Sequence, residues 1–171
     1  GRADIAFSVT KSALSTLAGA ALADGLIPSL DGRVCDTVAI EAFEGDHNAR
    51  VTWRHLLSLT SEWRGALWGI PDSIDWNRAM PKRPDAPPKG SPREIRSPGT
   101  YWEFNDVRVN LLALALTHVY GEGLESAFRR RIMDPIGASR DWAWNGYDGA
   151  EAVVGARTVP VVSGGAHWGG G

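Results

Sequence analysis

The spacing of apolar and polar residues predicts a helix over residues 8–24. Apolar side chains recur there every three or four residues, and Gly25 follows as a stop. The recurring positions are Leu14, Leu17, Ala18, Ala21 and Leu22. Small residues let neighbouring elements approach closely, so we expect this helix to be buried on most of its sides.

Two further helices follow from the same pattern. One is predicted over residues 107–120, with Asn105 or Asp106 as its cap and Gly121 as its end. The other starts at residue 124 and runs to about Met133, just before an Asp-Pro step that breaks it. Helices therefore dominate the middle of the chain.

The remaining segments predict loops, short turns and a little sheet. Residues 26–50 suggest a loop with one extended piece at 38–43, and Thr52 suits the cap of a short helix. Residues 65–100 hold seven of the ten prolines and predict an irregular region with short helical turns. Short strands are expected from Trp142 onward. This order indicates an α+β or mixed α/β organisation with only part of its sheet.

Composition narrows the classes of partner. The 171 residues suffice for one domain, and the formal net charge of −2 favours neither nucleic acid nor an anionic membrane as a partner. No apolar run is long enough to span a bilayer, and the amino end lacks the pattern of a signal peptide. We therefore expect no nucleic acid and no membrane span, and the compartment is left open.

Cysteine and histidine give no sign of a metal or a cofactor. The single cysteine, Cys35, allows no internal disulfide, and the four histidines do not have metal-ligand spacing. We expect neither a metal nor a cofactor. The eight tryptophans are numerous, and core packing explains them better than a pocket does.

Ser8 and Lys11 are the first candidate for chemistry. Positions i and i+3 share one face of a helix, so the lysine amine can reach the serine oxygen. A serine hydroxyl needs such a partner to act as a nucleophile, and the N–H groups at a helix start favour a developing anion. The alternative is that Ser8 caps a helix while Lys11 extends into water.

Four sequence blocks favour the first interpretation. The block "FSVTKS" around Ser8 resembles the nucleophile block of serine β-lactamases and penicillin-recognising enzymes. Three later blocks follow in the order that this family shows: "VTWRHLLSLTSEW", "SPGTYWEFNDVRVNLLALAL" and "FRRRIMDPIGASRDW". Together they cover most of the chain. The chain thus resembles the class C β-lactamase-related family, which includes penicillin-binding proteins, esterases and nylon-oligomer hydrolases.

The resemblance implies a fold and a set of roles. The fold would be α+β and β-lactamase/transpeptidase-like, an antiparallel sheet with flanking helices beside a helical region. Residues 1–171 would form a single partial domain whose N- and C-terminal sheet strands are missing. Ser8 would be the acylated nucleophile, Lys11 its proton-transfer partner, and the backbone N–H of Ser8 one half of an oxyanion hole.

The second motif of the family departs from its usual form. Tyr-x-Asn aligns with Phe104, Asn105 and Asp106, which the resemblance places at the substrate. Phenylalanine cannot transfer a proton, so Lys11 would act as the base with help from Asp106 or water. The other readings are that Tyr101 replaces the lost phenol, or that acylation is crippled and the domain only binds.

The third motif is expected to be absent. His167-Trp168-Gly169 fits its pattern by letters, but the resemblance places this glycine-rich stretch too early in the domain. The first hypothesis is a serine hydrolase that forms an acyl-enzyme on Ser8 from an ester, an amide or a β-lactam. The second is a catalytically weakened ligand-binding or sensor domain of the same fold.

Overall fold

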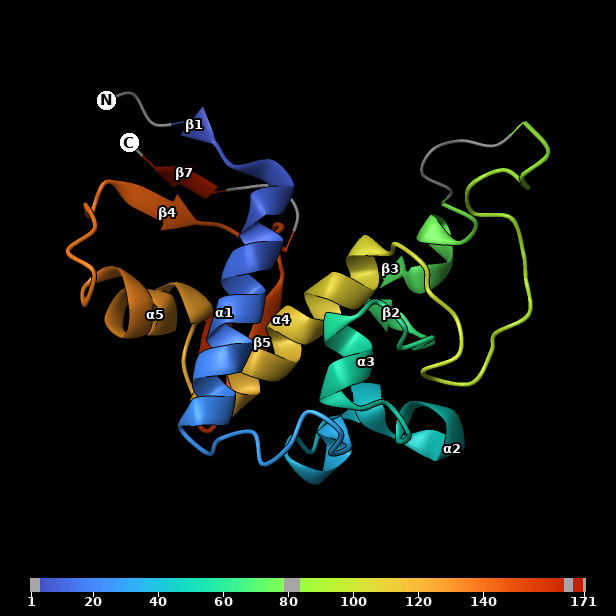
Figure 1. Ribbon diagram of the computed structural model, residues 1–171, viewed down its shortest axis with the longest axis horizontal. Coiled ribbons are helices and arrows are strands. Elements are labelled where there is room, and N and C mark those ends of the chain that lie inside the picture. The colour runs from blue at the N-terminus through green and yellow to red at the C-terminus, as the bar shows by residue number, and fades with distance from the viewer. Residues whose placement is uncertain (1–3, 79–83, 165–167, 171) are drawn as a thin grey trace. The chain divides into compact units, whose positions relative to one another are not determined.

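The computed structural model describes residues 4–78, 84–164 and 168–170. The chain forms two compact units, which are described separately (Figure 1). The first unit comprises residues 1–28 and 112–171, and the second comprises residues 29–111. Helix α4, Asp106–Tyr120, contributes residues to both.

Helix α1, Thr10–Ala23, begins the first unit and follows a single 3-10 turn, η1, at Phe7–Val9. One face of α1 is buried, as its apolar spacing predicts. Its buried residues are Thr10, Ala13, Leu14, Leu17, Ala18 and Ala21. Burial on most sides was the wrong expectation, because Ser12, Ser15 and Thr16 recur on the opposite face and are exposed.

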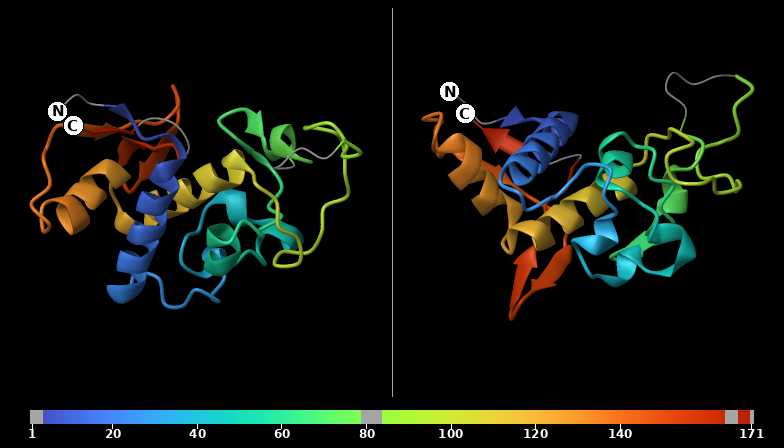
Figure 2. Two further views of the ribbon diagram at one scale, coloured as in Figure 1. Left: turned by 45° about the horizontal axis from the view of Figure 1, so that its top comes forward. Right: turned by 60° about the horizontal axis from the view of Figure 1, so that its bottom comes forward.

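The first unit holds a small antiparallel sheet and a hairpin. Strands β1 (Asp4–Ile5), β7 (Trp168–Gly170) and β4 (Trp142–Trp144) pair in the order β1-β7-β4 (Figure 1). Strands β5 (Glu151–Val154) and β6 (Arg157–Pro160) form the hairpin. Figure 2 shows this hairpin near the end of α4, where the Arg157 side chain donates to the Gly121 carbonyl. The short strands predicted after residue 142 are confirmed.

The helices predicted at 107–120 and 124–133 are also present, the first of them as α4 from Asp106. Asn105 is the cap of α4, because its Oδ1 accepts the backbone N–H of Arg108 at 3.2 Å. Helix α5, Leu124–Phe128, continues to Met133 as a π-helical turn, η5, Arg129–Met133. The Phe128 ring packs edge-on against Trp142 and Trp144 and joins this helix to β4.

The second unit is built from short elements. In chain order they are η2 (Val34–Asp36), η3 (Glu41–Phe43), α2 (Gly45–Asn48), α3 (Trp53–Leu57), β2 (Ala66–Leu67), β3 (Ile70–Pro71) and η4 (Asp72–Asp75). The extended piece expected at 38–43 is wrong, because a 3-10 turn there carries Phe43 into the core. Thr52 caps α3 as predicted, and His55 completes a capping box.

The architecture is α+β, as expected: helices with small antiparallel sheets. No helix in the described part of the chain has both the length and the apolarity needed to cross a membrane.

Candidate active site

Ser8 and Lys11 lie together in the first unit. Ser8 is exposed in the 3-10 turn η1, and Lys11 lies in the first turn of α1. The Lys11 Nζ donates to the Ser8 Oγ at 3.2 Å. The i, i+3 spacing therefore places the amine and the hydroxyl within proton-transfer distance, as a nucleophile and its base require.

The backbone is strained immediately before Ser8. Phe7 has a φ of +47°, a conformation that costs a non-glycine residue about 1–3 kcal/mol. Thr10 stabilises this turn, because its buried hydroxyl lies 2.8 Å from the Phe7 carbonyl oxygen and 2.9 Å from that of Gly164. Ser8 is the second residue of η1, and the backbone N–H groups in the first turn of a helix have no acceptor within that helix. That N–H is thus a donor available to a developing anion.

Phe104, Asn105 and Asp106 lie in the second unit, at the start of α4. Asn105 is fully buried and both ends of its amide are engaged. Its Nδ2 donates to the Asp72 carbonyl at 2.9 Å, while its Oδ1 caps the helix. The substrate-binding role of Asn105 stays a prediction.

Arg78 contacts both neighbours of Asn105. Its guanidinium lies 4.4 Å from the centre of the Phe104 ring and donates to Asp106 Oδ2 at 2.6 Å. Burial alone would lower the pKa of Arg78, but the hydrogen bond and the charge of Asp106 raise it above the ordinary value. A cation therefore lies over one face of the Phe104 ring.

Tyr101, the other candidate for the missing phenol, is stacked between two arginines. The guanidinium of Arg93 lies 4.9 Å from the centre of its ring, and that of Arg96 lies 4.5 Å away. These two contacts hold the ring in place. The geometry gives no support for a swing of Tyr101 toward another site.

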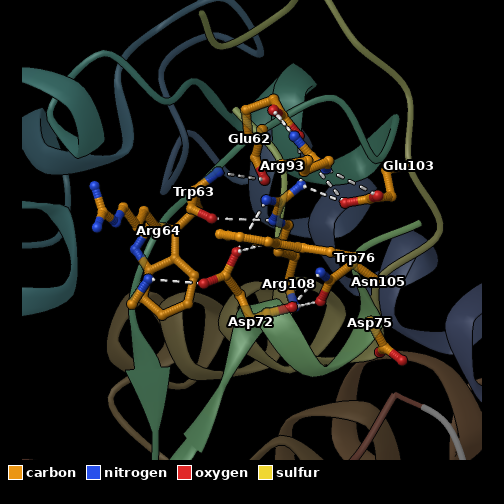
Figure 3. Close-up of polar contacts among 12 residues, drawn as sticks. Glu62, Trp63, Arg64, Asp72, Asp75, Trp76, Arg93, Glu103, Asn105 and Arg108 are labelled. Atoms are coloured by element: carbon orange, nitrogen blue, oxygen red, sulfur yellow. Dashed lines mark hydrogen bonds and ion pairs between the residues drawn. The ribbon is translucent and has the colours of Figure 1, made fainter. Parts of the chain in front are cut away.

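A buried ion cluster lies beside the start of α4 (Figure 3). It comprises Glu62, Asp72, Arg93, Glu103 and Arg108. Arg108 is 2% exposed and donates to Glu62, to Asp72 and to the Trp63 carbonyl. Arg93 pairs with both glutamates, at 2.6 Å to Glu62 and 2.5 Å to Glu103. The cluster ties the turn at Glu62, the turn η4 and the residue before Phe104 to helix α4.

The cluster favours the charged forms of Glu62 and Arg93. Burial alone would raise the pKa of Glu62, but hydrogen bonds from Arg93, the Arg96 backbone and Arg108 together lower it below the ordinary value. Burial alone would likewise lower the pKa of Arg93, and its two glutamate partners raise it well above the ordinary value. All five donors of Arg93 are used, one of them on the Glu94 carbonyl, so it has none left for a ligand.

The second and third sequence blocks contact each other in this unit. The Gly99 N–H donates to the Thr60 carbonyl, and the Glu103 N–H donates to the Leu59 carbonyl. Gly99 has a φ of +88°, and a Cβ there would lie 2.7 Å from Nε2 of His55. Glycine is therefore required in "PGT" by both the backbone and its neighbour.

Sequence reasoning missed the cluster, because its members are spread over 47 positions, from Glu62 to Arg108. The one feature of the sequence that could have pointed to the cluster is the number of charged residues near apolar runs. His167 lies outside the described residues. No group of three or more His, Cys, Asp or Glu side chains within the described ranges is placed to hold a metal ion.

Comparison with known proteins agrees with these blocks and this geometry. Residues 6–168 match the profile of the Beta-lactamase family, and the chain belongs to that family. No curated protein sequence matches the chain at a significant level.

The fold is similar to that of the octameric penicillin-binding protein homologue from Pyrococcus abyssi, with a TM-score of 0.59 and 18% identity. The match covers 98% of this chain and 42% of that one. The chain therefore spans less than half the length of this structural relative and shares its fold.

Proposed function

We propose that the chain carries the nucleophile of a serine hydrolase that forms an acyl-enzyme on Ser8. The observation that carries the proposal is the 3.2 Å contact between Lys11 Nζ and an exposed Ser8 Oγ. Membership of the Beta-lactamase family supports it. The substrate is a small ester, amide or β-lactam, with simple esters and small amides ahead of β-lactams.

The chemistry follows from the residues present in the turn. Ser8 Oγ attacks the substrate carbonyl carbon while its proton passes to the Lys11 amine. The carbonyl oxygen becomes an oxyanion and accepts the Ser8 backbone N–H. Collapse of this intermediate breaks the bond to the leaving group, which takes the proton from Lys11. Water then hydrolyses the acyl-serine and restores the hydroxyl.

Phe104, Asn105 and Asp106 are proposed to contribute to substrate binding. Arg78 and Asp106 form an ion pair where the family's phenol and amide are expected. This arrangement favours Lys11 as the base, because Phe104 cannot take a proton. A second candidate function is a binding or sensor domain with slow turnover, which the loss of the phenol at Phe104 also favours.

A burst assay with p-nitrophenyl acetate and a chromogenic cephalosporin tests the hydrolase. The proposal predicts a burst of product stoichiometric with protein, lost in Ser8→Ala and slowed at least a hundredfold in Lys11→Met. Arg50→Met is the matched control, because Arg50 is an exposed cation of the second unit. Equal hydrolysis by the wild type and Ser8→Ala would contradict the proposal.

Phe104→Tyr separates the two candidate functions. A large gain in steady-state turnover would show that acylation or deacylation was limited by the missing phenol, as in a weakened domain. Unchanged turnover with an intact burst would show that Lys11 serves as the base without it.

A further inference from the structure

The Thr10 hydroxyl contacts the peptide group on which the proposed chemistry depends. Thr10 is 0% exposed, and its Oγ1 lies 2.8 Å from the carbonyl oxygen of Phe7. The Phe7 carbonyl and the Ser8 N–H belong to one planar trans peptide and point in opposite directions. Whatever fixes the carbonyl therefore also fixes the direction of the Ser8 N–H.

This peptide group needs such a restraint. Phe7 has its φ at +47°, which a non-glycine residue keeps only when its surroundings hold it there. The Phe7 and Val9 side chains are 64% and 66% exposed, so side-chain packing does little to restrain the turn. The Phe7 carbonyl accepts the backbone N–H of Thr10 as well, so the Thr10 hydroxyl is a second and side-chain restraint on it.

The same hydroxyl connects the turn to the segment that follows β6. Thr10 Oγ1 lies 2.9 Å from the Gly164 carbonyl oxygen, and the neighbouring Ser163 carbonyl accepts Trp144 Nε1 at 2.9 Å. Trp144 is buried and packs edge-on against Phe128. A hydroxyl carries one proton, so it donates to one of its two carbonyls at a time and bridges them.

We infer that Thr10 is a positioning residue: its hydroxyl orients the Phe7–Ser8 peptide so that the Ser8 N–H faces the developing oxyanion. The inference rests on the proposed acylation of Ser8. Thr10 touches no reacting atom, so its loss slows the covalent step and leaves the initial binding of a reagent unchanged.

The test is the concentration dependence of covalent labelling by an alkyl fluorophosphonate, followed by intact mass. In this reaction Ser8 Oγ bonds to phosphorus, fluoride leaves and the serine proton passes to Lys11. Thr10→Val keeps the shape and removes the hydroxyl, and it should lower the maximal labelling rate about tenfold or more with half-saturation unchanged. Thr10→Ser restores the hydroxyl and should label within threefold of the wild type.

Thr117→Val is the matched control. Thr117 is also 0% exposed in the first unit, and its hydroxyl donates to the Ala113 carbonyl at 2.8 Å, away from Ser8. It should lower the melting temperature about as much as Thr10→Val and leave the labelling rate unchanged. A rate loss in Thr117→Val equal to that in Thr10→Val would contradict the inference, because lost stability would then explain both.

Each remaining outcome decides a separate claim. If the wild type and Thr10→Val are both labelled at Ser8 at the same rate, the inference about Thr10 is wrong and the proposed function stands. Wild-type protein that is not labelled at Ser8 overturns the proposed function and this inference with it. If Thr10→Val does not fold, Thr10→Ala replaces it; if neither folds, the hydroxyl serves the fold and the inference is wrong.

Discussion

The turn at Ser8 and the buried ion cluster place charged and polar groups in opposite settings. At the turn, Ser8 is exposed, the preceding residue is strained and a backbone donor is available. In the cluster, Arg93 and Arg108 are 12% and 2% exposed, and every donor of Arg93 is used. Polar groups whose hydrogen bonds are all made within the protein stabilise the fold. An available donor beside a strained backbone can instead interact with a reacting substrate.

The comparison also separates two kinds of family resemblance. The "FSVTKS" block places a hydroxyl and an amine where they can react. In "PGTYWEFND", by contrast, Gly99 fits against His55 and Asn105 caps a helix. A sequence block can therefore match a family because of its packing as well as its chemistry.

The largest effect is expected at Arg108. Arg108→Met leaves Glu62 and Asp72 buried with fewer partners and should lower the free energy of unfolding by about 3–5 kcal/mol. Urea unfolding measures it. Ser8→Ala in the same assay should change the value by less than about 0.5 kcal/mol. Comparable losses in the two variants would remove the contrast between the regions.

Gly99→Ala should follow in size. The added Cβ meets His55 in a backbone conformation that disfavours alanine, so we expect a loss of about 2 kcal/mol. Gly19→Ala is the control, because Gly19 lies in α1 with nothing within 4 Å of an added Cβ. Thermal unfolding should show Gly19→Ala to be stabilising by about 0.5–1 kcal/mol. A tolerated Gly99→Ala would show that the contact between the blocks is loose.

Substitution of Asn105 should lower the free energy of unfolding by less, and it tests whether this residue serves the fold or the substrate. Asn105→Ala removes the cap of α4 and the hydrogen bond to the Asp72 carbonyl, at a cost of about 1–2 kcal/mol. Asn105→Asp keeps an acceptor for the Arg108 N–H but loses the Nδ2 donor. If Asn105 is structural only, covalent labelling of Ser8 should be unchanged in both folded variants. A labelling rate that falls in Asn105→Asp would support its substrate-binding role.

The smallest expected effect is a pH dependence of stability at His55. Burial lowers the pKa of His55 below its ordinary 6.5, and its Nδ1 accepts the Thr52 N–H in the capping box. The unfolded chain therefore binds the proton more readily, so this contribution is complete above pH 6.5 and is lost as the pH falls below that value through the lowered pKa of the folded state. His118, whose pKa burial also lowers, adds to the same trend.

His55→Gln keeps an acceptor without a titration. Urea unfolding between pH 5 and 8 should show a shallower slope in this variant than in the wild type, because His118 still titrates. An unchanged slope would show that protonation of His55 does not disturb the capping box.

Much of the fold could be predicted from local pattern. Helix α1, helix α4 and the strands after Trp142 follow from spacing and capping residues, although the sequence left open whether Asn105 or Asp106 caps α4. The turn at Phe43 could not, because a short apolar run suits a strand or a buried 3-10 turn equally.

In the candidate site, too, the local contacts could be predicted from the sequence and the long-range contacts could not. The i, i+3 contact of Ser8 with Lys11 is local, so spacing predicts it. Arg78 over Phe104 and Arg108 beside Glu62 join residues 26 and 46 positions apart, and one sequence holds no periodicity that marks such pairs. The contact between Thr10 and Gly164 spans 154 positions, so local pattern could not predict it either.

The most direct measurement is the intact mass of the chain after exposure to an alkyl fluorophosphonate, with peptide mapping and a Ser8→Ala control. The account predicts one adduct per chain, located on Ser8 and absent from Ser8→Ala. Folded wild-type protein without an adduct, or an adduct that persists in Ser8→Ala, would contradict it and leave Ser8 as an ordinary residue of a helix start.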